Sequence, residues 1–275
     1  PIPLLELHGD TSRDEARRAL GIPPDTPMLL TVGRAIKYRP SGSHDFFRTV
    51  RSVLDRETRA QLYVVGLGEE EAIRWQIDFR HPRIHLCGAR TDLDRYWASA
   101  DLYLESMPFG SATALMEAVH AGLPAVLPFA PPLDLFVTNH GLESILRNPE
   151  TEADYVAEVI GLLRDDARRL ALAEALAAHI SAHHTGEGWR RQLEQLYALT
   201  DTLRHDPGPV PATGCVDSPL DRALSDWQAF LNQAPHDGTA RTSKSVAREV
   251  ALEVASKARE RGDYRDAAEI LLRYV

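Results

Sequence analysis

The fold is decided by residues 100–128, which read ADLYLESMPFGSATALMEAVHAGLPAVLP. The apolar run at 102–104 predicts a short strand that is buried on both faces. A loop with proline and glycine follows, and an apolar helix then begins at Ser111 or Thr113. Gly122 and Pro124 end this helix and lead into a second apolar run. A strand, a helix and a strand in this order predict an α/β fold with a parallel sheet.

The same alternation continues on both sides of this stretch. Short apolar runs bounded by Gly or Pro predict strands at 28–32, 62–65, 84–87, 102–104 and 125–127. Amphipathic runs between them predict helices at 46–54, 69–79, 92–98 and 113–121. With right-handed crossovers these units form one doubly wound, Rossmann-like parallel sheet, which is the predicted fold class.

The rest of the chain is predicted to be helical. Helices are expected at 153–163, 166–180 and 189–203, within one domain that covers residues 14–204 and follows a linker at 1–13. A second, proline-rich linker spans 205–219, and residues 220–275 form an α-helical region. The end of this region, around Gly262, resembles one tetratricopeptide repeat. A helical hairpin packed on the main domain explains the same pattern equally well.

Composition excludes several classes of protein. The 275 residues carry a net charge of -9, which disfavours binding to nucleic acid. The longest apolar runs are far shorter than the roughly 20 residues that a membrane-spanning helix needs. The two cysteines, Cys87 and Cys215, cannot form a disulfide framework, so we expect a cytoplasmic protein. His179 and His183 have the spacing of a metal site but lack a third ligand, so no metal is expected.

The start of the helix after 102–104 is a candidate anion site. The N–H groups of its first turn, at Ser111, Ala112 and Thr113, have no partner within the helix and attract negative charge. Gly110 removes a side chain that would keep a phosphate away. Glu117 lies one turn after Thr113, so Thr113 can donate to a phosphate while Glu117 accepts from ribose hydroxyls. The alternative is a capped core helix on which Glu117 is a solvated charge.

A second candidate segment, residues 31–39, follows the first predicted strand. It contains Arg34, Lys37 and Arg39 just past the carboxyl end of the strand, where ligands bind in open α/β sheets. Arg34 can hold phosphate oxygens with its planar guanidinium, and Lys37 can add a point charge. A solvated loop of cations is the alternative, but the position on the same sheet edge as Gly110 favours a shared phosphate site.

Several short motifs recur in a known order along the chain. They are Gly-Arg after the first strand, Val-Gly-Leu-Gly after the second, Ile-His-Leu-Cys-Gly at the third, Ala-Asp before the fourth, and Pro-Phe-Gly, Glu-Ala and Gly-Leu-Pro around the next helix. Residues from about 14 to 199 thereby resemble the C-terminal, donor-binding domain of GT-B glycosyltransferases, especially those of family 4 type. The resemblance implies a nucleotide-sugar donor, with UDP expected rather than GDP, and no cofactor.

The resemblance also implies roles for individual residues. Arg34 and Lys37 would hold the donor diphosphate together with the 110–113 helix start, and Glu117 would bind the ribose. Cys87 and Gly88 would lie beside the base. The reaction would be the transfer of a sugar, of hexosyl type, to an unknown glycan, lipid or protein acceptor.

Two departures from the family pattern limit this interpretation. The family has an acidic residue eight positions before the second Glu, but Phe109 stands there and Glu105 lies four residues too early. The Pro-Phe-Gly-Ser-Ala-Thr stretch looks more like the phosphate loop of O-linked N-acetylglucosamine transferases. The donor sugar and the stereochemical course therefore stay open.

The chain begins at Pro1 rather than Met, and we expect it to be a piece that supplies half of an active site. An isolated donor domain is expected not to transfer sugar. A non-catalytic interaction module, favoured by Phe109, is the first alternative. A nicotinamide-dependent oxidoreductase is the second, because Gly66-Leu67-Gly68 follows a strand, but the three glutamates at 69–71 would repel a pyrophosphate.

Overall fold

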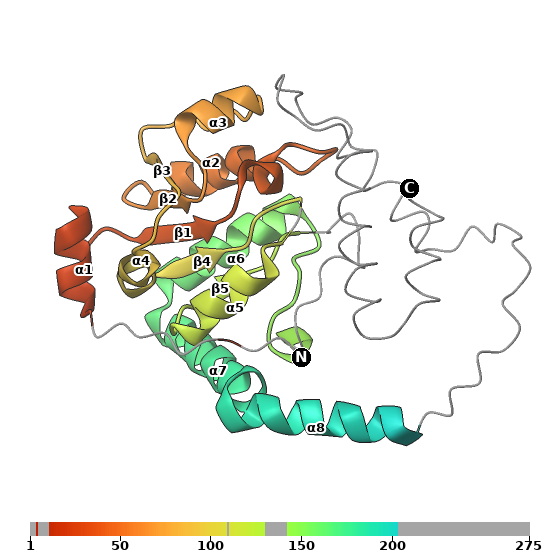
Figure 1. The fold of residues 1–275 in the computed structure, drawn as a ribbon. Helices are drawn as coiled ribbons and strands as arrows, with labels where there is room; N and C mark the ends of the chain where they lie inside the picture. Colours follow the sequence, from red (N-terminus) through yellow and green to blue (C-terminus); the bar gives the residue numbers. More distant parts are fainter. Residues whose placement is uncertain (1–3, 5–10, 109, 130–141, 203–275) are drawn as a thin grey trace, which may run out of the picture. The chain divides into compact units, whose positions relative to one another are not determined.

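The computed structural model describes residues 4, 11–108, 110–129 and 142–202 (Figure 1). The chain divides into two compact units, 1–215 and 216–275, and all described residues belong to the first. Most of the predicted linker at 1–13 lies outside the described residues. The linker at 205–219 with Cys215, the helical region at 220–275 and Phe109 lie outside them as well.

Five parallel strands form the predicted sheet. They are β1 Met28–Val32, β2 Gln61–Val65, β3 Ile84–Gly88, β4 Leu102–Leu104 and β5 Ala125–Val126. Their order in the sheet is β3-β2-β1-β4-β5, which confirms the doubly wound, Rossmann-like topology. The chain builds outward from β1 to β3 on one side and then from β4 to β5 on the other. The direction of winding therefore reverses between β1 and β4.

The strands alternate with helices in the described part of the chain. These are α1 Arg13–Leu20, α2 Phe46–Arg56, α3 Glu69–Arg74, α4 Leu93–Ser99, α5 Ala112–His120, α6 Glu152–Arg164, α7 Asp166–His184 and α8 Gly186–Thr202. Two 3-10 turns, η1 Ala35–Tyr38 and η2 Leu142–Ser144, complete the set. No helix within the described ranges is both long and apolar enough to cross a membrane.

Side chains of the strands alternate between two hydrophobic clusters, one on each face of the sheet. On β1, Leu29 belongs to the first cluster, whereas Met28 and Leu30 belong to the second. Helices α2 and α6 cover the first cluster, and α4, α5 and α7 cover the second. This two-sided burial explains why the strands are continuous apolar runs in the sequence.

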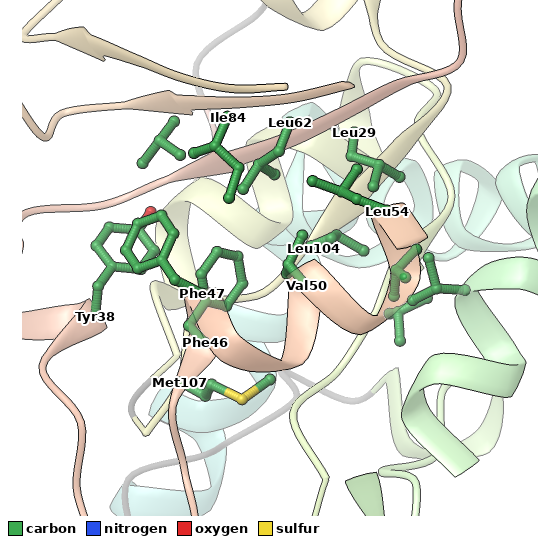
Figure 2. Close-up of a cluster of buried hydrophobic side chains, with 14 of the residues drawn as sticks. Leu29, Tyr38, Phe46, Phe47, Val50, Leu54, Leu62, Ile84, Leu104 and Met107 are labelled. Carbon is green, nitrogen blue, oxygen red and sulfur yellow. The ribbon is translucent and has the colours of Figure 1, made fainter. Parts of the chain in front are cut away.

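Tyr38 anchors η1 in the first cluster. Its ring centroid lies 5.2 Å from that of Phe46 and 5.7 Å from that of Phe47, and Figure 2 shows the three rings together beneath the sheet. Its hydroxyl lies 3.1 Å from Oγ1 of Thr31. Because the ring is fully buried, it fixes the position of the preceding residue, Lys37.

Two helices differ most from the sequence prediction. The helix expected at 69–79 ends at Arg74, because Gln76 adopts a left-handed conformation with φ 56° and the chain turns to bury Ile77. Helix α1 was not predicted. It is closed by a capping box between Ser12 and Glu15.

Arg17 of α1 closes the edge of the sheet where the strands begin. Its guanidinium is only 3% exposed and donates to a carboxylate oxygen of Asp101 over 2.8 Å. The same Asp101 oxygen accepts the N–H of Met28, the first residue of β1. The guanidinium also donates to the carbonyl groups of Pro23, Pro24, Thr26 and Ser99. This network ties α1 to the amino ends of β1 and β4.

Candidate functional site

The two segments with predicted site residues flank the point where the sheet reverses its winding. Residues 33–38 follow β1 directly, and residues 105–113 connect β4 to α5. In open α/β sheets such a reversal sends neighbouring crossovers in opposite directions and places a crevice outside the carboxyl ends of the two strands, here β1 and β4. In open α/β sheets this crevice is the usual place for a ligand.

The structure brings these two segments into direct contact. The ammonium group of Lys37 donates a hydrogen bond to the carbonyl oxygen of Gly110. A Cβ atom on Gly33 would lie only 3.2 Å from Oγ of Ser111, so this glycine allows the two loops to approach closely. The predicted side-by-side arrangement on one sheet edge is therefore present.

Three glycines join the carboxyl ends of β1, β2 and β3. The N–H of Gly33 donates to the carbonyl of Val65, and the N–H of Gly66 donates to the carbonyl of Gly88 over 2.7 Å. Gly66 has φ 93°, and a Cβ atom there would lie 2.7 Å from the backbone oxygen of Gly33. No residue with a side chain fits this position, which explains why glycine stands directly after β2.

The N-terminus of α5 is open. Its N-cap, Ser111, makes no side-chain hydrogen bond to the first turn. The hydroxyl of Ser111 lies 3.2 Å from that of Ser106 instead. The N–H groups of Ala112 and Thr113 have no hydrogen-bond partner among the residues that the structure describes. Thr113 is exposed, and the positive end of the helix is therefore accessible to an anion.

Glu105 is a residue of this site that the sequence analysis considered only as a misplaced acid and did not assign to the site. It lies just after β4, is 1% exposed, and its Oε1 accepts the N–H groups of Ser106 and Ser111, each over 2.7 Å. Burial raises the pKa of its carboxyl, while these hydrogen bonds and the charge of Lys37 lower it. The missing side chain of Gly110 would point at this carboxylate, at 3.5 Å from Cδ, rather than at a ligand.

The two predicted cations have different surroundings. Arg34 is exposed and precedes η1 as its N-cap. Lys37 is half-buried, and burial lowers the pKa of its ammonium. The charge of Glu105 raises this pKa, and the charge of Arg34 lowers it further. The exposed side chain of Arg34 could therefore adjust its position to a ligand, whereas Lys37 is fixed against the loop before α5.

Glu117 faces the same side of α5 as Thr113, one turn further along. It is half-buried, and burial raises the pKa of its carboxyl. Within the described ranges its side chain forms no hydrogen bond or ion pair. A partly buried carboxylate without a partner is costly, so a ligand with hydroxyl groups would satisfy it.

Gly33, Gly66 and Gly88 form a row along the carboxyl ends of β1, β2 and β3, the glycine row. The residues predicted beside a base lie at its far end. Gly88 ends β3 with φ 63°, and its N–H donates to the carbonyl of Leu67 over 3.0 Å. Cys87 is half-buried, and burial raises the pKa of its thiol. The carbonyl of Gly88 accepts a hydrogen bond from Gly66, and Gly66 packs on Gly33. The glycine row therefore extends from β1, where the winding reverses, to β3.

The histidines considered for a metal lie elsewhere, on α7. The rings of His179 and His183 stack with their centroids 4.2 Å apart, and Nδ1 of His183 lies 2.8 Å from the carbonyl oxygen of His179. Among the described residues, no group of three or more His, Cys, Asp or Glu side chains could hold a metal ion.

The fold agrees with comparisons to known proteins. Residues 26–165 match the family model described as glycosyl transferases group 1. The chain is 27% identical over 205 residues to a D-inositol 3-phosphate glycosyltransferase of Corynebacterium aurimucosum, which covers 69% of this chain and 47% of that protein. It is 31% identical over 191 residues to the UDP-N-acetylglucosamine–N-acetylmuramyl-(pentapeptide) pyrophosphoryl-undecaprenol N-acetylglucosamine transferase of Clavibacter sepedonicus, which covers 64% of this chain and 47% of that enzyme.

A solved structure shares the fold. WaaG, a glycosyltransferase involved in lipopolysaccharide biosynthesis, matches with a TM-score of 0.54 and 17% identity, over 73% of this chain and 55% of that one. The chain spans about half the length of the curated relatives it matches. The resemblance to GT-B glycosyltransferases is confirmed. The family model covers more than half of the 275 residues, and the chain belongs to the group 1 glycosyl transferases.

Proposed function

We propose that the described domain binds the diphosphate of a nucleotide sugar in the crevice between β1 and β4, and that the protein transfers the sugar to an acceptor. One observation carries this proposal. Where the winding of the sheet reverses, the ammonium of Lys37 donates a hydrogen bond to the loop before α5. The first turn of α5 has two N–H groups without a partner among the described residues. A fixed cation beside an open helix N-terminus is a site for a phosphate.

The same groups suit the chemistry of sugar transfer. When the bond between sugar and diphosphate breaks, negative charge grows on the departing diphosphate. Lys37, Arg34 and the N-terminus of α5 would stabilise that charge, because their dipoles and charges are in place before the reaction. These groups provide the stabilisation without a metal ion, and we propose that the protein uses none.

Glu117 and the glycine row would position the nucleoside. The carboxylate of Glu117 would accept hydrogen bonds from ribose hydroxyls, and the base would lie near Cys87 and Gly88 at the end of β3. The Clavibacter sepedonicus relative is named for a UDP-linked donor, which supports uridine diphosphate as the nucleotide here. We propose a hexosyl group as the transferred sugar.

Calorimetry with nucleotides tests the proposal. At millimolar UDP we expect measurable heat and a Kd that corresponds to about -4 to -6 kcal/mol. UDP should bind more tightly than GDP, UMP or uridine. Lys37→Ala should weaken binding, whereas Arg56→Ala, which removes an exposed charge from the far end of α2, should not. A chain that gives no heat and no thermal shift with any nucleoside diphosphate contradicts the proposal.

A transfer assay tests how much of the reaction this chain performs. We propose that the 275 residues bind donor but do not turn it over, since the match spans only 47% of the length of the curated relative. Proximity of acceptor and donor can contribute about 7 kcal/mol or more to a barrier, and the described domain offers the donor side. The chain is incubated with labelled UDP-sugars and sugar, lipid and peptide acceptors. Multiple turnovers would refute this part of the proposal.

A further inference from the structure

Glu105 is the most deeply buried carboxylate beside the proposed phosphate site. Its Oε1 accepts three hydrogen bonds, from the N–H groups of Ser106 and Ser111 and from the hydroxyl of Ser106. Its Oε2 is buried and has no hydrogen-bond partner among the residues that the structure describes. Burying a carboxylate oxygen without a hydrogen-bond partner costs free energy, so we look for a function that explains the position of Glu105.

We propose that Glu105 is a positioning residue for the donor diphosphate, which holds the backbone turn before α5 and the ammonium of Lys37 in the geometry that receives the phosphates. This inference rests on the proposed function of the site. Glu105 itself is too deeply buried to touch a ligand, so it acts through other groups.

The first part of this role is mechanical. Ser111 is the N-cap residue of α5, and its N–H donates to the buried Glu105. This hydrogen bond fixes the turn from its buried side. The next two N–H groups, of Ala112 and Thr113, stay available on the ligand side. Gly110 packs against the same carboxylate, since a Cβ atom there would lie 3.5 Å from its Cδ.

The second part of the role is electrostatic. Lys37 is bound to the carbonyl of Gly110, on the turn that Glu105 supports, and the negative charge of Glu105 raises the pKa of the half-buried ammonium, which burial lowers. Lys37 is the one lysine among the first 243 residues, where arginine supplies every other cation. Unlike a guanidinium, an ammonium loses its proton readily when buried, so Lys37 depends on a neighbouring anion.

The remaining charged and titratable groups near Glu105 leave Lys37 as its counterion. Tyr38 before α2, Tyr103 of β4 and Tyr155 of α6 face it, and burial raises the pKa of all three hydroxyls, so they stay neutral. Arg34 adds a second positive charge near Lys37 and lowers the pKa of its ammonium. Among these groups, Glu105 alone raises that pKa.

The test compares the wild-type chain with Glu105→Gln, which keeps an acceptor oxygen for Ser111 but removes the charge. The chain has three lysines, Lys37, Lys244 and Lys257, so ¹³C-labelled lysine gives few NMR signals, and Lys37→Arg assigns the one of interest. We expect the Lys37 signal to titrate at lower pH in Glu105→Gln. We also expect the UDP affinity of the variant, relative to wild type, to fall about fivefold more at pH 9 than at pH 7.

Three further variants separate the two parts of the role. Glu105→Ala removes the acceptor for Ser111 and should weaken UDP binding at every pH. Glu105→Asp keeps the charge, so Lys37 should titrate close to its wild-type range while UDP binding weakens. Glu57→Gln removes a carboxylate at the end of α2, where Glu57 pairs with Arg164, and should change neither readout.

The outcomes distinguish a failure of this inference from a failure of the proposed function on which it rests. A wild-type chain that does not bind UDP or GDP overturns the proposed function. An unchanged Lys37 titration in a folded Glu105→Gln variant overturns the inference, whatever the nucleotide result, because that readout needs no ligand. A purely structural role would change thermal stability and binding together at all pH values, without moving the Lys37 titration, and this result would also overturn it.

Discussion

Helices α5 and α6 both begin after a hydroxyl residue, yet their N-termini differ. At α6, Oγ1 of Thr151 accepts the N–H of Asp154, and the carboxylate of Asp154 accepts the N–H and hydroxyl of Thr151. This capping box closes the first turn. At α5, Ser111 makes no such bond to the first turn. A hydroxyl at the N-cap position therefore does not reveal whether a helix start is closed or open.

The surroundings of Ser111 explain the difference. Its hydroxyl lies near that of Ser106, and its N–H is held by Glu105, so both polar groups are turned away from the helix. The third helical residue is Ala114, which has no carboxylate to complete a capping box. The cap of α6 stabilises the fold, whereas the start of α5 leaves the N–H groups of Ala112 and Thr113 without a partner among the described residues, where we propose that a ligand binds.

The largest expected effect concerns the cation beside the open turn. Lys37→Ala should weaken UDP binding by about 2 to 3 kcal/mol, since it removes a charge-assisted hydrogen bond to phosphate. Arg34→Ala should weaken UDP less, because Arg34 is exposed, and should leave uridine unaffected. Calorimetry with both ligands measures these changes. Equal losses for uridine and UDP would place Arg34 away from the phosphates.

The next effect concerns the carboxylate one turn inside α5. Glu117→Ala should weaken UDP binding by about 1 to 3 kcal/mol, because it removes charge-assisted bonds to ribose hydroxyls. The fold should survive, since Glu117 has no partner within the part of the chain that the structure describes. Calorimetry and circular dichroism check the two statements. An unchanged affinity in a folded variant would remove Glu117 from the site.

The two N-caps themselves give a smaller and more direct contrast. Thr151→Ala should lower the free energy of unfolding by about 1 kcal/mol, because it opens the capping box of α6. Ser111→Ala should change it by no more than about 0.5 kcal/mol, because its side chain caps nothing. Urea unfolding of both variants measures the contrast. Equal losses of stability would show that Ser111 acts as a conventional cap.

The smallest effect is a difference in pH dependence between two glutamates. Burial raises the pKa of Glu117 above its ordinary 4.5, so its contribution to stability is present below that value and lost as pH rises through the folded pKa. Glu15, in the capping box of α1, has a lowered pKa, so its contribution is present above 4.5 and lost as pH falls. Urea unfolding between pH 3 and pH 7 should show opposite slopes for Glu117→Gln and Glu15→Gln, relative to wild type. Parallel slopes would contradict this assignment.

The sequence predicted the elements whose signals are local. The strands at 28–32 and 102–104 have the predicted bounds, because Pro27 and Gly33 bound the first apolar run and the acidic Asp101 and Glu105 bound the second. The end of α3 was wrong because burial of Ile77 overrides the helical pattern. Helix α1 escaped prediction because its inner face carries Arg17, a charge that only distant carbonyls and Asp101 make acceptable.

The candidate site was predictable to a similar degree. The sequence placed Lys37 and Gly110 on one sheet edge, because the carboxyl ends of parallel strands share an edge. It did not assign Glu105 to the site, since the burial of this residue depends on the chain folding back between residues 105 and 111. An acidic residue directly after an apolar strand was the available signal.

The buried network around Arg17 also predicts how the backbone exchanges its hydrogens with solvent. The amides of Met28 and Asp101 donate to the Asp101 carboxylate and to the Met28 carbonyl, respectively, so their deuteration requires α1 and two strands to separate. The amides of Ala112 and Thr113, at the opposite edge of the sheet, need no such opening. Deuterium uptake should therefore be slowest where the strands begin and fastest at the start of α5, and a bound nucleotide should slow it at the start of α5 alone.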